Sequence, residues 1–184
     1  MASSSLNTLA EHLGVPERTL RRAAAEGLVR GERTSARKFV TSMREEAYLR
    51  THWPLLSGLR AALRTEPGVR LAVMFGSLAA GTAGDGSDID LLVRLGDPSA
   101  RRVAELTGRL EERIGRDVQL VRIQDAERTP LLMRDALEQG RVLIDREHEW
   151  AGLVARLPTW RRRARTAETS LLDAMPDLDL GRTL

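Results

Sequence analysis

The chain has 184 residues, 42% of them hydrophobic and 30% charged, so it can bury the core of one full domain or two small ones. It contains no cysteine, which excludes disulfides and thiolate metal sites, and no apolar run approaches a membrane span or a signal-peptide core. We therefore expect a cytoplasmic protein without a membrane partner.

Positive charge is concentrated in the first third of the chain. Residues 1–65 carry 11 Lys and Arg against 6 Asp and Glu, whereas the remaining residues carry 18 against 20. The formal net charge of the whole chain is only +3. This asymmetry, more than the number of arginines, indicates an anionic partner for the N-terminal part.

The first residues have the pattern of a helix followed by a turn and a second helix. The apolar positions that share one face of the first predicted helix are Leu6, Leu9, Ala10 and Leu13. Gly14 ends this helix, Pro16 suits the first turn of the next one, and Gly27 ends the second helix. The segment therefore predicts a helix-turn-helix.

A polar loop at residues 31–36, flanked by short segments at 28–30 and 37–40, predicts a hairpin or wing. The whole segment resembles a winged helix-turn-helix, especially the N-terminal part of MerR-like regulators. That resemblance implies DNA contacts, to phosphates first. The residues assigned to the interface are Arg18, Arg21, Arg22, Arg33, Arg37 and Lys38. The alternative is a module that only packs or forms a homodimer, with its arginines on a solvated helix face.

Ser42 and Glu45 have the spacing of a capping box, so a helix is predicted to begin there. Pro54 is expected to break or restart this helix, and an apolar stripe follows at residues 55–63. Residues 66–68, Glu-Pro-Gly, are expected to end it and to mark a domain boundary.

The middle of the chain allows chemistry to be inferred residue by residue. The apolar run Leu71–Phe75 predicts a buried strand that ends at Gly76-Ser77, a pair suited to a backbone turn with an exposed hydroxyl. Asp88 and Asp90 begin the next predicted strand, where alternation places both carboxylates on one face. Such carboxylates repel each other unless they share a proton or a hard cation, and we favour Mg²⁺.

The pattern Gly76-Ser77, ten residues, Asp88-x-Asp90, with Gly81 between, resembles the signature of the DNA polymerase β type nucleotidyltransferase superfamily, most closely its minimal members. The resemblance implies that Gly76, Ser77 and Ser87 bind the triphosphate of an NTP, with ATP as first choice. It also implies that the two aspartates hold catalytic Mg²⁺. Minimal members often act with a HEPN-domain toxin, whose tyrosine they adenylylate, so a HEPN-type partner is implied. The alternative is an ordinary loop with solvated carboxylates.

The family places a third carboxylate in a later strand, and here the predicted strand at residues 117–123 departs from the pattern. The best register puts Gln119 at that position, with Asp117 two residues earlier on the same face. An amide oxygen can bind a metal but neither takes a proton nor supplies charge. We therefore expect tight nucleotide binding with slow or undetectable transfer.

A helix at residues 130–139 and a last strand at 142–145 complete the pattern. The expected fold is α/β, an α+β nucleotidyltransferase core with a mixed sheet, preceded by a small, mostly helical winged helix-turn-helix domain. The expected units are residues 1–66, residues 67–146 and a C-terminal helical segment at 147–184.

Two functions of different classes remain open. The first is a Mg²⁺-dependent enzyme that moves a nucleoside monophosphate, AMP as first choice, from an NTP to a hydroxyl acceptor, including a protein side chain in an antitoxin role. The second is a DNA-binding regulator that keeps the fold as a nucleotide sensor or dimerisation unit, with weak or no turnover. Release of pyrophosphate separates the two.

Overall fold

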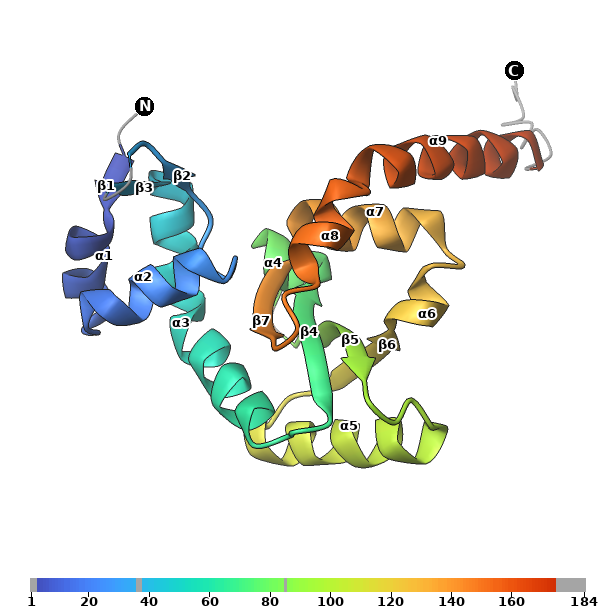
Figure 1. Cartoon of the computed structure of the whole chain (residues 1–184), viewed down its shortest axis with the longest axis horizontal. Helices are drawn as coiled ribbons and strands as arrows, with labels where there is room; N and C mark the ends of the chain where they lie inside the picture. Colours follow the sequence, from blue (N-terminus) through green and yellow to red (C-terminus); the bar gives the residue numbers. More distant parts are fainter. Residues whose placement is uncertain (1–2, 36–37, 85, 175–184) are drawn as a thin grey trace, which may run out of the picture.

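The structure is a computed structural model that describes residues 3–35, 38–84 and 86–174. A small N-terminal module, residues 3–42, leads through one long helix to a four-stranded sheet with helices on both faces (Figure 1). The elements of the N-terminal module are β1 (Ser3–Ser5), α1 (Leu6–Leu13), α2 (Glu17–Ala25), β2 (Glu32–Arg33) and β3 (Phe39–Ser42). The long helix is α3 (Met43–Arg64).

From the sheet onward, each strand is followed by one or two helices. These elements are β4 (Val69–Phe75), α4 (Gly76–Ala80), β5 (Ile89–Leu95), α5 (Ala100–Ile114), β6 (Val118–Arg122), α6 (Ile123–Ala126), α7 (Pro130–Gln139), β7 (Arg141–Asp145), α8 (Trp150–Ala155) and α9 (Leu157–Ala174). The strand order is β6-β5-β4-β7, in which β5 and β6 are parallel and the other pairs antiparallel. The predicted α/β class with a mixed sheet is confirmed.

In the N-terminal module, β1, β3 and β2 form a small antiparallel sheet beside α1 and α2. The prediction of a strand at residues 28–30 was wrong, because β2 is a two-residue strand within the segment expected to be loop. Leu28 and Val29 are buried instead. The Leu28 carbonyl accepts a hydrogen bond from Arg141, and the Arg30 N–H donates to Glu45, so these backbone groups bind side chains rather than a strand.

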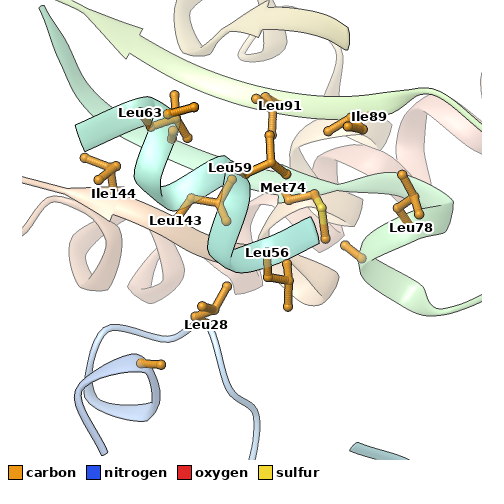
Figure 2. Packing of buried hydrophobic residues seen from close by; sticks show 14 of the residues in the cluster. Leu28, Leu56, Leu59, Leu63, Met74, Leu78, Ile89, Leu91, Leu143 and Ile144 are labelled. Carbon is orange, nitrogen blue, oxygen red and sulfur yellow. The ribbon is translucent and has the colours of Figure 1, made fainter. Parts of the chain in front are cut away.

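The prediction that Pro54 interrupts the helix was also wrong, because α3 runs through it. Proline removes one helical hydrogen bond, but packing on both sides of this position holds the helix together. Leu56, Leu59 and Leu63 are fully buried against the sheet, and Figure 2 shows them beside Met74, Leu91 and Leu143. Tertiary contacts therefore override the local signal.

Ser42 caps α3 as the sequence predicts, since its hydroxyl accepts the Glu45 N–H at 3.1 Å. The second half of the capping box does not form. The Glu45 carboxylate binds Arg141 of β7 instead.

Successive side chains along the central strands point to opposite faces of the sheet, where they enter two separate clusters. On one face Ile89, Leu91 and Val93 pack with α3, α5 and the N-terminal helices. On the other face Leu71, Val73 and Leu92 pack with α6, α7, α8 and α9. The first cluster is continuous from α1 to β5, so α3 is covered by both parts of the chain.

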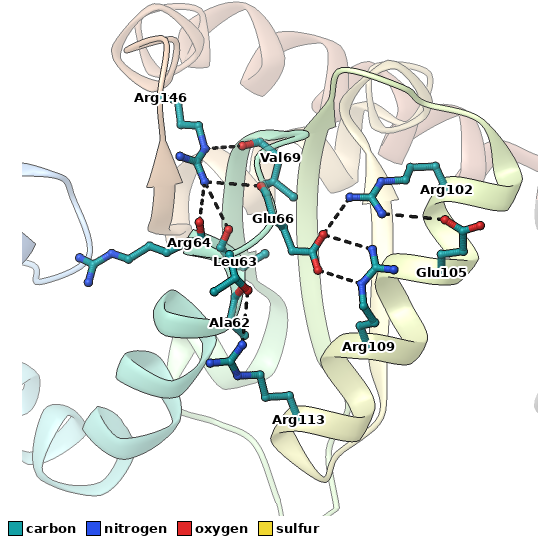
Figure 3. A network of polar contacts seen from close by, with 11 residues as sticks. Ala62, Leu63, Arg64, Glu66, Val69, Arg102, Glu105, Arg109, Arg113 and Arg146 are labelled. Atoms are coloured by element: carbon teal, nitrogen blue, oxygen red, sulfur yellow. Dashed lines mark hydrogen bonds and ion pairs between the residues drawn. The ribbon is translucent and has the colours of Figure 1, made fainter.

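A polar network fixes the connection from α3 to β4, residues 65–68 (Figure 3). The Glu66 carboxylate accepts hydrogen bonds from Arg102 and Arg109 of α5. Burial favours the protonated form, but these two arginines outweigh it and hold the pKa of Glu66 below its ordinary value. Arg146 donates to the carbonyl of Val69 at 2.8 Å. Within the described ranges, no helix is both long and apolar enough to cross a membrane.

Candidate functional site

The end of β4 and the starts of β5 and β6 meet at one edge of the sheet, which we call the carboxylate edge (Gly76, Ser77, Asp88, Asp90 and Gln119). In the strand register Phe75 pairs with Asp90, and Asp90 pairs with Gln119. Paired residues of neighbouring strands point to the same face and lie about 5 Å apart. The register therefore brings together residues that are far apart in the chain.

Gly76 makes a close approach to Asp90 possible. Its φ is 72°, in the left-handed region, and a Cβ at this position would lie 2.4 Å from Oδ2 of Asp90. Any other amino acid at position 76 would be strained at this φ, and its Cβ would displace the Asp90 carboxylate. The glycine that follows β4 thus positions Asp90, in addition to any role toward a ligand.

We expect Gly76→Ala to destabilise the fold by more than Gly86→Ala. Gly86 has a φ of 83°, but among the described residues beyond its chain neighbours no atom lies within 4 Å of its would-be Cβ, so its substitution costs only the backbone term, about 1–2 kcal/mol. Gly76→Ala adds the clash with Asp90, about 1–3 kcal/mol more. Urea denaturation of both variants measures the difference. Equal losses would show that Asp90 moves away freely.

The two aspartates are near neighbours but differ in surroundings. Asp88 is exposed and precedes β5, whereas Asp90 is partly buried in the strand. Burial, and then the negative charge of Asp88, raise the pKa of the Asp90 carboxyl. Such a pair is relieved by a shared cation, so the donor set fits Mg²⁺, which is commonly held by one or two carboxylates plus substrate phosphates. Among the described residues, no third His, Cys, Asp or Glu joins them.

Gln119 occupies the position beside Asp90 in the parallel pairing of β5 with β6, and its side chain is exposed. Asp117 lies just before β6, where its carbonyl accepts the Ile89 N–H at 2.9 Å. Asp117 lies two residues before Gln119 on the same face, so its carboxylate is farther from Asp90 than the Gln119 amide is. An amide thus takes the place nearest the partly buried aspartate.

Ser77 and Ser87 lie on the two segments that flank the edge, and both are partly buried. Ser77 is the second residue of α4, and its carbonyl accepts the N–H of Thr82 at 3.0 Å. The Ser87 carbonyl accepts a hydrogen bond from Arg116. Arg116, which precedes β6, was not singled out by the sequence pattern but holds the segment that carries Asp88.

A family model described as polymerase beta, nucleotidyltransferase, matches residues 58–149, which is half of the chain. The chain belongs to this family. The match starts within α3 and ends before α8, so it contains the carboxylate edge of the nucleotidyltransferase domain. The N-terminal module lies outside it.

Solved structures show the same fold at low sequence identity. One is a chain of a toxin-antitoxin crystal structure with AMP-PNP, with 23% identity and a TM-score of 0.53, covering 64% of this chain and 95% of that one. Another belongs to tri-AMPylated Shewanella oneidensis HEPN toxin in complex with MNT antitoxin, with 20% identity, a TM-score of 0.51, and coverage of 67% and 97%. A search of curated proteins finds no match.

The described basic residues assigned to DNA contact lie on α2 and on the hairpin that contains β2 and β3. Arg21 and Arg22 form i,i+4 ion pairs with Glu17 and Glu26, which reduces the charge they offer to phosphates. Arg21, Arg33 and Lys38 nevertheless line one shallow depression of about 260 Å³. Arg18 is exposed on α2, and Arg37 lies outside the described residues.

Proposed function

We propose that the chain binds a nucleoside triphosphate, ATP as first choice, with Mg²⁺ at the carboxylate edge and transfers the nucleoside monophosphate to a hydroxyl. One observation carries this proposal: the strand register and Gly76 bring Asp90 against the phosphate turn, with Asp88 beside it. Membership of the nucleotidyltransferase family supports it.

In this proposal the chain supplies mainly positioning and charge. Asp88 and Asp90 hold Mg²⁺, which neutralises charge on the phosphates when bound. The backbone and hydroxyls of Gly76, Ser77 and Ser87 orient the phosphate chain. The acceptor oxygen bonds to the α-phosphorus, the bond between that phosphorus and the bridging oxygen breaks, and pyrophosphate leaves. The hydroxyl proton passes to water, because the neutral amide of Gln119 does not accept it.

For the acceptor we propose a protein side chain on a HEPN-type partner, with the chain as the antitoxin. The support is the fold shared with chains from toxin-antitoxin complexes, one of which contains a tri-AMPylated HEPN toxin. We propose residues 67–146 as the catalytic unit, residues 1–66 as a winged helix-turn-helix unit and residues 147–184 as a helical extension.

Calorimetric titration of each NTP, with and without Mg²⁺, tests the proposal. We expect binding that requires Mg²⁺ and is weakened at least tenfold by Asp88→Ala with Asp90→Ala, since one tenfold step corresponds to about 1.4 kcal/mol. Asp97→Ala is the matched control, because this aspartate lies in the exposed turn after β5. Equal binding of all four nucleotides by wild type and the double variant would rule out metal-linked nucleotide binding.

A second function, DNA binding by the N-terminal module, is supported by the depression that joins Arg21, Arg33 and Lys38. The amide at position 119 favours weak turnover at the carboxylate edge, which this second function would allow. In this reading the module is MerR-like and the nucleotidyltransferase fold acts as a nucleotide sensor or dimerisation unit with weak turnover.

If the module binds DNA, the affinity of the full chain for duplex DNA should fall about tenfold or more between 50 and 200 mM salt, because phosphate contacts release counterions. Arg33→Gln with Lys38→Gln should reduce this salt dependence. Arg101→Gln, an exposed arginine of α5, should leave it unchanged. Absence of any mobility shift on genomic DNA at low salt would leave only the packing role.

A further inference from the structure

A cleft of about 840 Å³ lies between the N-terminal module and the nucleotidyltransferase domain. Arg30 of the module and Arg44 and Tyr48 of α3 line one part of it, and Thr82 and Arg141 line another. Sites for small molecules typically measure about 300–1,000 Å³. The cleft therefore has the size of a ligand site, and it is built largely from residues outside the family match.

The charge of its wall is positive. The pKa of Arg30 is lowered by burial, then by the nearby charge of Arg141, with a smaller contribution from Arg44, while Glu45 acts in the opposite direction. The lining thus holds three arginines, Arg30, Arg44 and Arg141, against two carboxylates, and Glu45 is already engaged by Arg141 at 2.6 and 2.8 Å. Glu32, the other carboxylate of the lining, is exposed. This imbalance favours an anion.

Tyr48, which lines the cleft, carries a polar group that no described residue satisfies. Tyr48 is only 8% exposed, and its buried hydroxyl has no hydrogen-bond partner among the described residues. Its ring stacks on Arg141, with 3.6 Å from Cζ to the ring centroid, and touches His52. Burial raises the pKa of Tyr48 to about 12, so the hydroxyl remains a donor. A buried donor without a partner is costly, and a movement of Tyr48 that brought its hydroxyl to an acceptor in the cleft would relieve that cost.

The cleft is separate from the carboxylate edge. Asp90 and Leu92 are two residues apart on β5, so their side chains point to the same face of the sheet. The Leu92 side chain enters the cluster that packs against α7, so the Asp90 carboxylate faces away from α3. The side chains of Arg141 and Leu143 point to the same face of β7, and Leu143 packs with α3 on the opposite face of the sheet. The lining includes none of the five residues of the carboxylate edge. The turn after α4 joins the sites: Thr82 lines the cleft, and its N–H donates to the Ser77 carbonyl.

We propose that this cleft is a second ligand site, which binds a small phosphate-bearing molecule at Arg30 and Arg44, beside Tyr48. The bound molecule bridges the N-terminal module and the segment that follows α4. It thereby acts on the Ser77 turn from the opposite face of the sheet. The proposal concerns regulation and holds whether or not the carboxylate edge transfers nucleotides.

His52 provides a direct readout, because it lines the cleft and the chain has only three histidines. Burial, then the charges of Arg141 and Arg116, lower its pKa. Pyrophosphate, AMP and ATP should each be titrated into the full chain without Mg²⁺, while the three histidine ring signals are followed by NMR. We expect a saturable shift of the His52 signal with at least one probe, with His12 and His148 unchanged. The three probes separate recognition of the phosphates from recognition of a nucleoside.

Two variants locate the bound probe. Arg44→Gln, at an exposed position, should weaken the His52 response about tenfold, and Arg101→Gln should leave it unchanged. Asp88→Asn with Asp90→Asn should preserve it, since the cleft does not use these residues. The proposal is overturned if no probe shifts His52 at millimolar concentration. It is equally overturned if the aspartate variant abolishes the response while Arg44→Gln retains it.

Discussion

Arg141→Met should lower the free energy of unfolding by about 3–5 kcal/mol, because it leaves one member of a buried ion pair without its partner. Arg141 is 1% exposed and Glu45 is 6% exposed. The substitution also removes the donors to the carbonyls of Ala79, at 3.0 Å, and Leu28, at 3.1 Å. Urea denaturation followed by circular dichroism measures the loss.

Two comparisons separate the buried pair from a general effect of losing charge. Arg134→Met removes an ion pair with Glu168 that is partly exposed, and should cost less than about 1 kcal/mol. Arg141→Met combined with Glu45→Met should recover part of the loss, since the unpaired carboxylate is removed as well. A loss of similar size in Arg134→Met and Arg141→Met would show that the buried ion pair between Arg141 and Glu45 contributes no more than a partly exposed one.

Gln119→Asp should raise the rate of pyrophosphate release from MgATP by about 10²-fold or more, because it restores a charged base beside Asp90. Asp117→Ala should change that rate by less than about twofold, because same-face positions along a strand lie about 6.6–7 Å apart, too far for one ligand to replace the other. Coupled assays of pyrophosphate release on both variants, with the HEPN-type acceptor or water, give the comparison.

The two variants must also be compared in nucleotide binding. Gln119→Asp should retain the wild-type affinity within a few fold, so that a change in rate reports chemistry. If Asp117→Ala abolishes release and Gln119→Asp has no effect, Asp117 is the third catalytic carboxylate and the chain is an ordinary active transferase. That outcome would leave the strand register intact and change only the assignment of roles.

Most of the nucleotidyltransferase domain could be predicted from the sequence, because its signals are local. The apolar run before Gly76 and the alternation after Asp88 each lie within one strand, β4 and β5. Gly115 ends α5 at a φ of 72°, as a helix-ending glycine should. Local patterns of this kind define elements, and the short connections between them limit how the sheet can be ordered.

The errors concern residues whose conformation depends on distant partners. Glu45 and Arg141 are 96 positions apart, and nothing near Arg141 in the sequence distinguishes it from the polar start of a strand. Pro54 is a strong local signal for interruption, yet contacts from both parts of the chain outweigh it. In the segment 28–30, the Arg30 N–H and the Leu28 carbonyl bind side chains from α3 and β7, which periodicity does not reveal.

Because α3 is covered by the N-terminal helices and by the sheet, neither part can unfold while the other keeps its full set of buried contacts. Amide protons in the middle of α3 should therefore exchange with solvent only when the whole molecule opens, whereas those near the end of α9 exchange through local fraying. If a nucleotide binds at the carboxylate edge as proposed, it should stabilise the native state as a whole. It should therefore slow hydrogen exchange in α1 and α2 as well, although neither helix contributes a residue to the carboxylate edge.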